Sequence, residues 1–189
     1  MSMRRLVVLA WGNESRGDDG LGPAFLAHAE ALADPPGAET TFVADFQLQP
    51  EHALDLAGRD LALFVDASLT AAAPFTFRRI EAARTATFST HGVAPGVVLD
   101  AFAATFGRAA PPAYELAIRG DRFELGTPLG MRARAHLAAA LAFFAELRRE
   151  PADRAWREAQ DRAAASGADA GAARPAPRLQ SSGDASRTR

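Results

Sequence analysis

The chain contains no cysteine and no lysine, and each absence excludes whole classes of chemistry. Without cysteine there is no thiol nucleophile, disulfide, iron–sulfur cluster or cysteine-bound zinc. All 21 basic residues are arginine, which excludes a P-loop lysine, a Schiff-base lysine and a Ser–Lys dyad. Any metal site must therefore use histidine nitrogen and carboxylate oxygen.

The chain also has little net charge and no long apolar segment. The formal net charge is −2, which favours neither nucleic acid nor an anionic membrane surface as a partner. No apolar segment approaches the roughly 18 to 20 residues of a membrane span. The N-terminal apolar run has about five residues, fewer than the roughly 7 to 15 of a signal-peptide core. We expect a cytoplasmic monomer that binds neither nucleic acid nor membrane.

Short β-type runs alternate with helical patterns through the first 149 residues. Uninterrupted apolar runs at 6–10 and 61–65 are typical of strands covered on both faces, whereas 75–80 alternates like an edge or antiparallel strand. Further strands are expected at 40–46 and 114–118, and helices at 20–33, 50–57, 94–106 and 130–148. The pattern predicts an α/β three-layer sandwich: a mostly parallel twisted sheet of about five strands with one antiparallel edge strand and helices on both faces.

Two local patterns give further expectations. In the first helix, Leu21, Phe25, His28 and Leu32 recur at helical spacing and predict one buried stripe. Near Glu150 the composition changes to Ala, Arg, Asp, Ser, Gly and Pro, with few large apolar residues. We therefore expect one domain over 1–149 and a disordered, dispensable tail over 150–189, with at most a transient helix at 152–165.

The segment GNESRGDDGLGP, from Gly12 to Pro23, joins the first strand to the first helix, where open α/β sheets bind ligands. Gly12 and Gly17 have the glycine spacing of a phosphate loop. The acidic pair Asp18 and Asp19 follows where such a loop has Lys and Ser or Thr, so a nucleotide is disfavoured and a cation favoured. The alternative is that one of the two aspartates caps the helix, and the segment alone leaves both readings open.

Two more residues at strand or helix ends could join a cation site. Asp66 follows the apolar run LALFV, and His91 stands in STHGVAP just before an expected helix. An imidazole with two carboxylates suits a divalent transition metal that keeps open positions. Taken singly, an aspartate such as Asp66 is more often a turn or cap residue than a ligand.

The combination resembles the nickel–iron hydrogenase maturation proteases, which remove a C-terminal extension from the hydrogenase large subunit. The resemblance runs from Leu6 to about Leu147 and rests on Gly12-Asn13 with the acidic pair and Gly20-Leu21-Gly22, on Asp66 and on His91. It implies Asp19, Asp66 and His91 as catalytic metal ligands, with nickel supplied by the substrate precursor as a recognition handle and no nucleotide cofactor. The hydrogenase large-subunit precursor is then the partner.

The run from Asp45 to His52 departs from the usual family pattern. It looks like the branch that serves NAD-reducing, bidirectional hydrogenases, and we expect the polar loop residues Gln47, Gln49, Glu51 and His52 to select the client. The alternative is that Phe46 and Leu48 pack inward while the polar residues face water. At the level of function, a generic zinc metallohydrolase and a non-catalytic nickel-checking chaperone are the alternatives.

Overall fold

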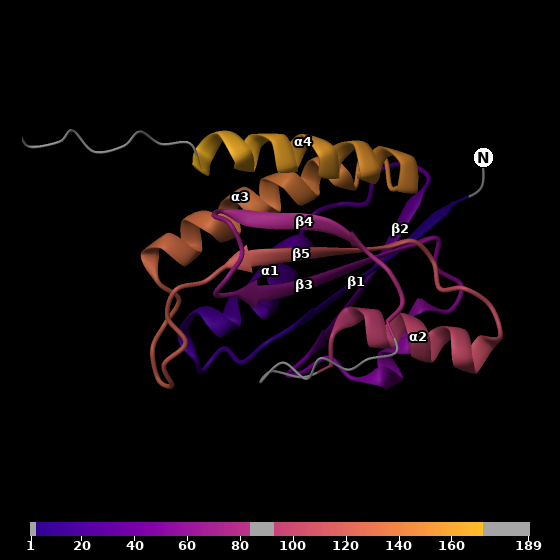
Figure 1. Cartoon of the computed structure of the whole chain (residues 1–189), viewed down its shortest axis with the longest axis horizontal. Coiled ribbons are helices and arrows are strands. Elements are labelled where there is room, and N and C mark those ends of the chain that lie inside the picture. The colour runs from indigo at the N-terminus through magenta and orange to yellow at the C-terminus, as the bar shows by residue number, and fades with distance from the viewer. Residues whose placement is uncertain (1–2, 84–92, 172–189) are drawn as a thin grey trace, which may run out of the picture.

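In the computed structural model, which describes residues 3–83 and 93–171, a five-stranded sheet lies between layers of helices (Figure 1). The strands are β1 (Arg4–Trp11), β2 (Ala38–Asp45), β3 (Leu61–Ser68), β4 (Phe75–Ile80) and β5 (Ala113–Arg119). The helices are α1 (Leu21–Ala29), α2 (Pro95–Phe106), α3 (Met131–Leu147) and α4 (Asp153–Gly171), with 3-10 helices η1 (Gly17–Gly20) and η2 (Pro50–Leu56). Within the described ranges, no helix combines the length and apolar character of a membrane span.

The strand order is β2-β1-β3-β5-β4, with β4 antiparallel to β5 and the other pairs parallel. This confirms the predicted fold class, including the antiparallel edge strand. The four parallel strands end at one edge of the sheet, which lies at the left for β3 and β5 in Figure 1. Loops that follow these strands therefore meet at that edge.

Two apolar cores explain the uninterrupted apolar runs in the central strands. In β1, Leu6, Val8 and Ala10 belong to the core that contains α1 and α3, whereas Val7 and Leu9 belong to the core that contains η2 and α2. Successive side chains of a strand point to opposite faces, so a strand covered on both faces has no polar position.

The first helix corrects the expected buried stripe. It ends at Ala29, and its buried residues are Leu21, Gly22, Phe25, Leu26 and Ala29. His28 is exposed, with Nδ1 2.7 Å from the carbonyl oxygen of Ala24, and Leu32 lies beyond the helix and is exposed. The prediction that the buried stripe extends to Leu32 was wrong, because the helix ends about one turn earlier than the apolar spacing suggested.

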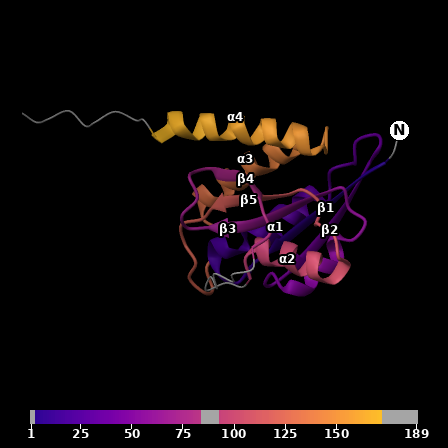
Figure 2. The ribbon, with the colours of Figure 1, turned by 45° about the vertical axis from the view of Figure 1, so that its right-hand side comes forward.

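The tail expectation is wrong for residues 153–165, since this part of α4 packs on the body of the protein (Figure 2). Trp156 is fully buried against Phe77 and Tyr114, and its indole N–H donates to the Leu147 carbonyl at 3.1 Å. The Gln160 side chain accepts the backbone N–H of Arg79 in β4. Composition alone underestimated how much of the tail packs on the domain, because a single tryptophan that contacts other aromatic side chains buries a large apolar area.

Candidate active site

The loop after β1 is held in a conformation that brings Asp19 back against the end of the strand. Gly12 has φ +142°, and a Cβ there would lie 2.0 Å from the Asp19 carbonyl oxygen. The position therefore requires glycine both for its backbone angle and for the close approach. The 3-10 helix η1 follows and carries both aspartates of the acidic pair.

Asp18 is a structural carboxylate. It is 1% exposed and accepts three backbone N–H groups from the loop after β5: Oδ2 from Asp121 at 2.8 Å and Arg122 at 3.0 Å, and Oδ1 from Gly130 at 2.8 Å. Asp18 thereby ties the loop and the beginning of α3 to η1. The capping alternative is wrong for α1, because its N-cap is Gly20 and no side chain caps it.

Asp19 and Asp66 come together, as the sequence predicts. Asp19 is 8% exposed, and its Oδ2 accepts the Asn13 backbone N–H at 3.2 Å. Asp66 lies in β3, and its Oδ1 accepts the Ala67 backbone N–H at 2.7 Å. Both carboxylates line one pocket of about 600 Å³ together with Trp11, and both also line a smaller neighbouring pocket of about 100 Å³.

The environment of Asp66 favours its neutral form. Burial, together with the nearby charges of Asp19 and Glu115, raises the pKa of Asp66 to about 7, although hydrogen bonds from the Ala67 backbone and the Trp11 side chain act to lower it. A carboxyl with a pKa near 7 can release or accept a proton at neutral pH. Such a group in a pocket is a candidate for proton transfer or cation binding.

His91 lies outside the described residues, so the structure does not place it. Val93, two positions later in the sequence, lines the pocket with Asp19 and Asp66, as does Pro95 at the beginning of α2. Among the residues that the structure does describe, no group of three or more His, Asp and Glu side chains could hold a metal ion. Two carboxylates are thus in place, and the histidine stays a prediction.

Sequence reasoning missed an ion pair in the same pocket. Arg78 of β4 and Glu115 of β5 are paired across the sheet, with Nε and Nη2 of the arginine 2.6 and 2.5 Å from Glu115 Oε2. The available signal was a charged residue in the interior of the strand AYELAIR, between Tyr114 and Leu116. Ser68 also lines the pocket, but its Oγ accepts the backbone N–H groups of Thr70 and Ala71 in a local turn.

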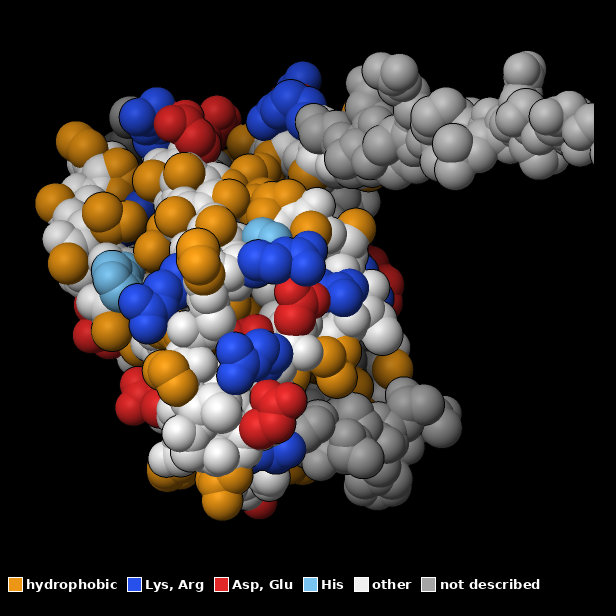
Figure 3. All heavy atoms as spheres, turned by 90° about the vertical axis from the view of Figure 1, so that its left-hand side faces the viewer, with side chains coloured by type: hydrophobic (Ala, Val, Ile, Leu, Met, Phe, Trp, Pro, Cys, Tyr) orange, Lys and Arg blue, Asp and Glu red, His pale blue; other side chains and the backbone are white. Residues whose placement is uncertain are grey.

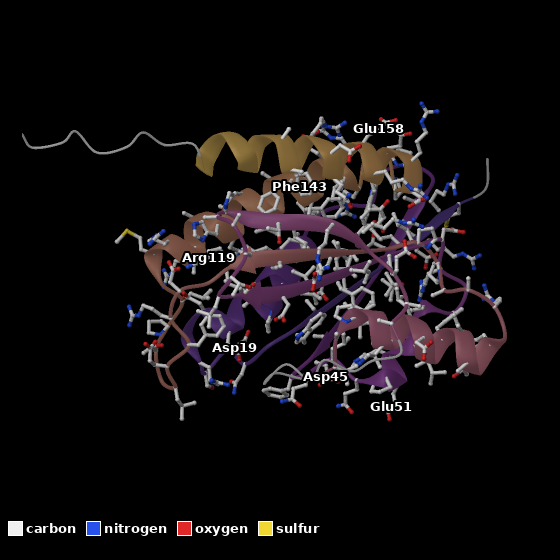
Figure 4. All side chains as sticks on the ribbon, in the orientation of Figure 1. Asp19, Asp45, Glu51, Arg119, Phe143 and Glu158 are labelled. Carbon is white, nitrogen blue, oxygen red and sulfur yellow. The ribbon has the colours of Figure 1, made fainter. Side chains whose placement is uncertain are left out.

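In the loop after β2, some side chains pack against the domain and others are exposed. Phe46 is 73% exposed and lines the smaller pocket, whereas Leu48 is buried, so only Leu48 packs inward. His52 uses both ring nitrogens: Nδ1 accepts the Gln49 backbone N–H at 3.0 Å, and Nε2 lies 3.3 Å from Asp45. His52 therefore fixes the loop to the end of β2. Figure 4 shows Asp19, Asp45 and Glu51 toward the same side of the molecule.

Neither a protein-family model nor a curated protein sequence matches this chain. Solved structures do. They include the [NiFe] hydrogenase maturation protease HycI from Thermococcus kodakarensis KOD1, with 19% identity, a TM-score of 0.60, and coverage of 77% of this chain and 93% of that one. The E. coli hydrogenase maturating endopeptidase HybD has 21% identity, a TM-score of 0.58, and coverage of 76% and 92%.

The hydrogenase 2 maturation peptidase from Thaumarchaeota archaeon SCGC_AB-539-E09 is similar at 19% identity and a TM-score of 0.53, with coverage of 76% of this chain and 97% of that one. The chain shares the fold of these proteins. Almost the whole length of each has a counterpart here, whereas just under a quarter of this chain lies outside each match.

Proposed function

We propose that this protein is an endopeptidase that removes the C-terminal extension of a nickel–iron hydrogenase large-subunit precursor after nickel insertion. The observation that supports it most directly is the convergence of Asp19 and Asp66 on one pocket at the carboxyl edge of this fold. Figure 3 views the molecule from the left-hand side of Figure 1, where arginine and acidic side chains are interspersed with apolar ones.

Asp19, Asp66 and His91 are proposed to bind the nickel that the precursor carries. Nickel held by thiolates of the precursor would present open positions, and these side chains could fill them and so place the adjacent peptide bond in the pocket. Cation binding suits Asp66 in particular. A positive charge beside it would favour the ionised carboxylate that burial now disfavours.

Water is the proposed nucleophile. The chain has no cysteine, and Ser68 at the pocket is occupied as an acceptor of backbone N–H groups rather than paired with a base. A carboxylate of the site is proposed to activate that water. We further propose that the client is a cytoplasmic NAD-reducing hydrogenase, on the sequence of the run from Asp45 to His52.

The test is incubation of the nickel-loaded precursor with the protein, followed by the intact mass of the large subunit. We expect loss of the extension with the wild type, and no loss with Asp19→Ala, Asp66→Ala or His91→Ala. The matched control is Asp60→Asn, an exposed carboxylate at the opposite edge of the sheet, which should process at the wild-type rate.

Three results would overturn the proposal. Cleavage of free peptides by a protein that copurifies with zinc would indicate a generic metallohydrolase. Binding of the nickel-loaded precursor without any change of mass would indicate a chaperone. Wild-type processing by the Asp66→Ala variant would show that this pocket is not the active site.

A further inference from the structure

The pocket floor is the part of the sheet face that α2 leaves uncovered. Across the strands, Asp66, Ala117 and Thr76 are register partners and form one row on this face. The next row toward the amino ends contains Phe64, Glu115 and Arg78. All of these except Phe64 line the 600 Å³ pocket, so the pocket extends from the two aspartates across β5 to β4. The small side chain of Ala117 leaves this path open.

Arg78 and Glu115 differ in their exposure. The Glu115 side chain is 14% exposed, whereas that of Arg78 is 64% exposed. Among the described residues, the Arg78 guanidinium contacts Glu115: its Nε and Nη2 both lie against the same oxygen, Oε2. Because the guanidinium is planar and has five N–H donors, the edge bearing Nη1 remains for a second acceptor. Glu115 thus holds an arginine in the wall of the pocket.

We propose that Arg78, positioned by Glu115, binds a carboxylate of the substrate polypeptide and so contributes to substrate selection. The inference rests on the proposed function, because it takes Asp19 and Asp66 as the end of the pocket at which the peptide bond is cut. A planar arginine held on one edge is suited to a carboxylate on its other edge.

The position of that carboxylate follows from the register. Asp66 and Arg78 are two strand spacings apart across the sheet and two residues apart along it, which places their Cα atoms about 12 Å from each other. An extended peptide rises about 3.3 Å per residue. The recognised carboxylate therefore lies three to four residues from the scissile bond.

The first test measures processing of nickel-loaded precursors that carry Glu, Gln or Lys at the third and fourth residues on either side of the cleaved bond. The wild type should prefer Glu to Gln by about three- to tenfold in kcat/KM at one of these positions, mainly through KM. Arg78→Gln should abolish the preference, and Glu115→Gln should weaken it. Arg122→Gln is the matched control, since that side chain is 60% exposed and lies outside the pocket.

The second test keeps the inference separate from the proposed function. The peptides Ac-Ala-Ala-Ala-Glu-Ala-NH2 and its Gln counterpart are titrated against the protein, with NMR shifts of the Trp11 indole as the signal. Tighter binding of the Glu peptide that disappears in Arg78→Gln supports the inference even if no precursor is processed. Ac-Ala-Ala-Ala-Ala with a free or amidated C-terminus distinguishes a chain end from a side chain. Equal binding of all four peptides, or a preference that survives Arg78→Gln, overturns it.

Discussion

The buried carboxyl of Asp66 predicts a specific loss of stability as the pH rises. Its ordinary pKa is 3.8, and burial raises the pKa in the folded protein to about 7. Between these values the folded state holds a proton that the unfolded state has released, so unfolding is increasingly favoured as pH increases. At about 1.4 kcal/mol per pH unit, the full effect is about 4 kcal/mol, complete above the folded pKa and absent below pH 3.8.

Asp66→Asn isolates this effect, because an amide resembles the neutral carboxyl in shape and does not ionise. We expect the free energy of unfolding of this variant to match the wild type near pH 4 and to exceed it by up to about 4 kcal/mol at pH 8. The measurement is urea unfolding across this range with a chelator present. The carboxylates with lowered pKa values, Asp34, Asp121 and Asp153, are common to both proteins and cancel in the difference.

A second variant tests the cause of the shift. Asp19→Asn removes a negative charge that raises the pKa of Asp66, so the pH at which stability declines should move lower. A difference between Asp66→Asn and wild type that stays constant from pH 4 to pH 8 would refute the reasoning, since it would mean that Asp66 titrates alike in the folded and unfolded states.

Three further outcomes follow from the contacts. Asp18→Ala should lower the free energy of unfolding by about 3 kcal/mol or more in urea unfolding, because three backbone N–H groups lose their acceptor; a change below about 0.5 kcal/mol would contradict this role. Trp156→Ala should lower the free energy of unfolding by about 3 to 5 kcal/mol and lower Tm; an unchanged Tm would mean that the tail is dispensable for stability after all. Phe46→Ser should leave Tm unchanged and raise KM for the precursor, because Phe46 is exposed beside the two aspartates; an unaltered KM would show that this side chain does not contact the precursor.

The strands and most helices were predictable because burial on both faces of the sheet leaves uninterrupted apolar runs. The ends of helices were less predictable. The spacing of Leu21, Phe25 and Leu32 suits one stripe, yet the chain leaves the helix after Ala29 and turns toward β2. The packing of Trp156 was not predictable from local composition, since Phe77 and Tyr114 lie more than 40 residues before it in the chain.

The location of the candidate site was predictable from the sequence, but the separate roles of its residues were not. Asp19 follows β1 and Asp66 lies near the end of β3, and two parallel strands bring such residues to the same edge of the sheet. The sequence could not tell Asp18 from Asp19, because the partners that make Asp18 structural are more than 100 residues away. The pair formed by Arg78 and Glu115 depends on strand register, which the sequence leaves open.

The position of α4 beside β4 has a consequence for how copies of this protein behave at high concentration. β4 lies at one edge of the sheet. An uncovered edge strand has free backbone N–H and C=O groups, with which a strand from another chain can pair. The Gln160 side chain accepts the outward N–H of Arg79, and Trp156 seals the aromatic residues beneath. The helix therefore occupies a backbone N–H that an added strand would need, which disfavours such pairing along β4, and its Arg154 and Glu158 side chains form an exposed ion pair.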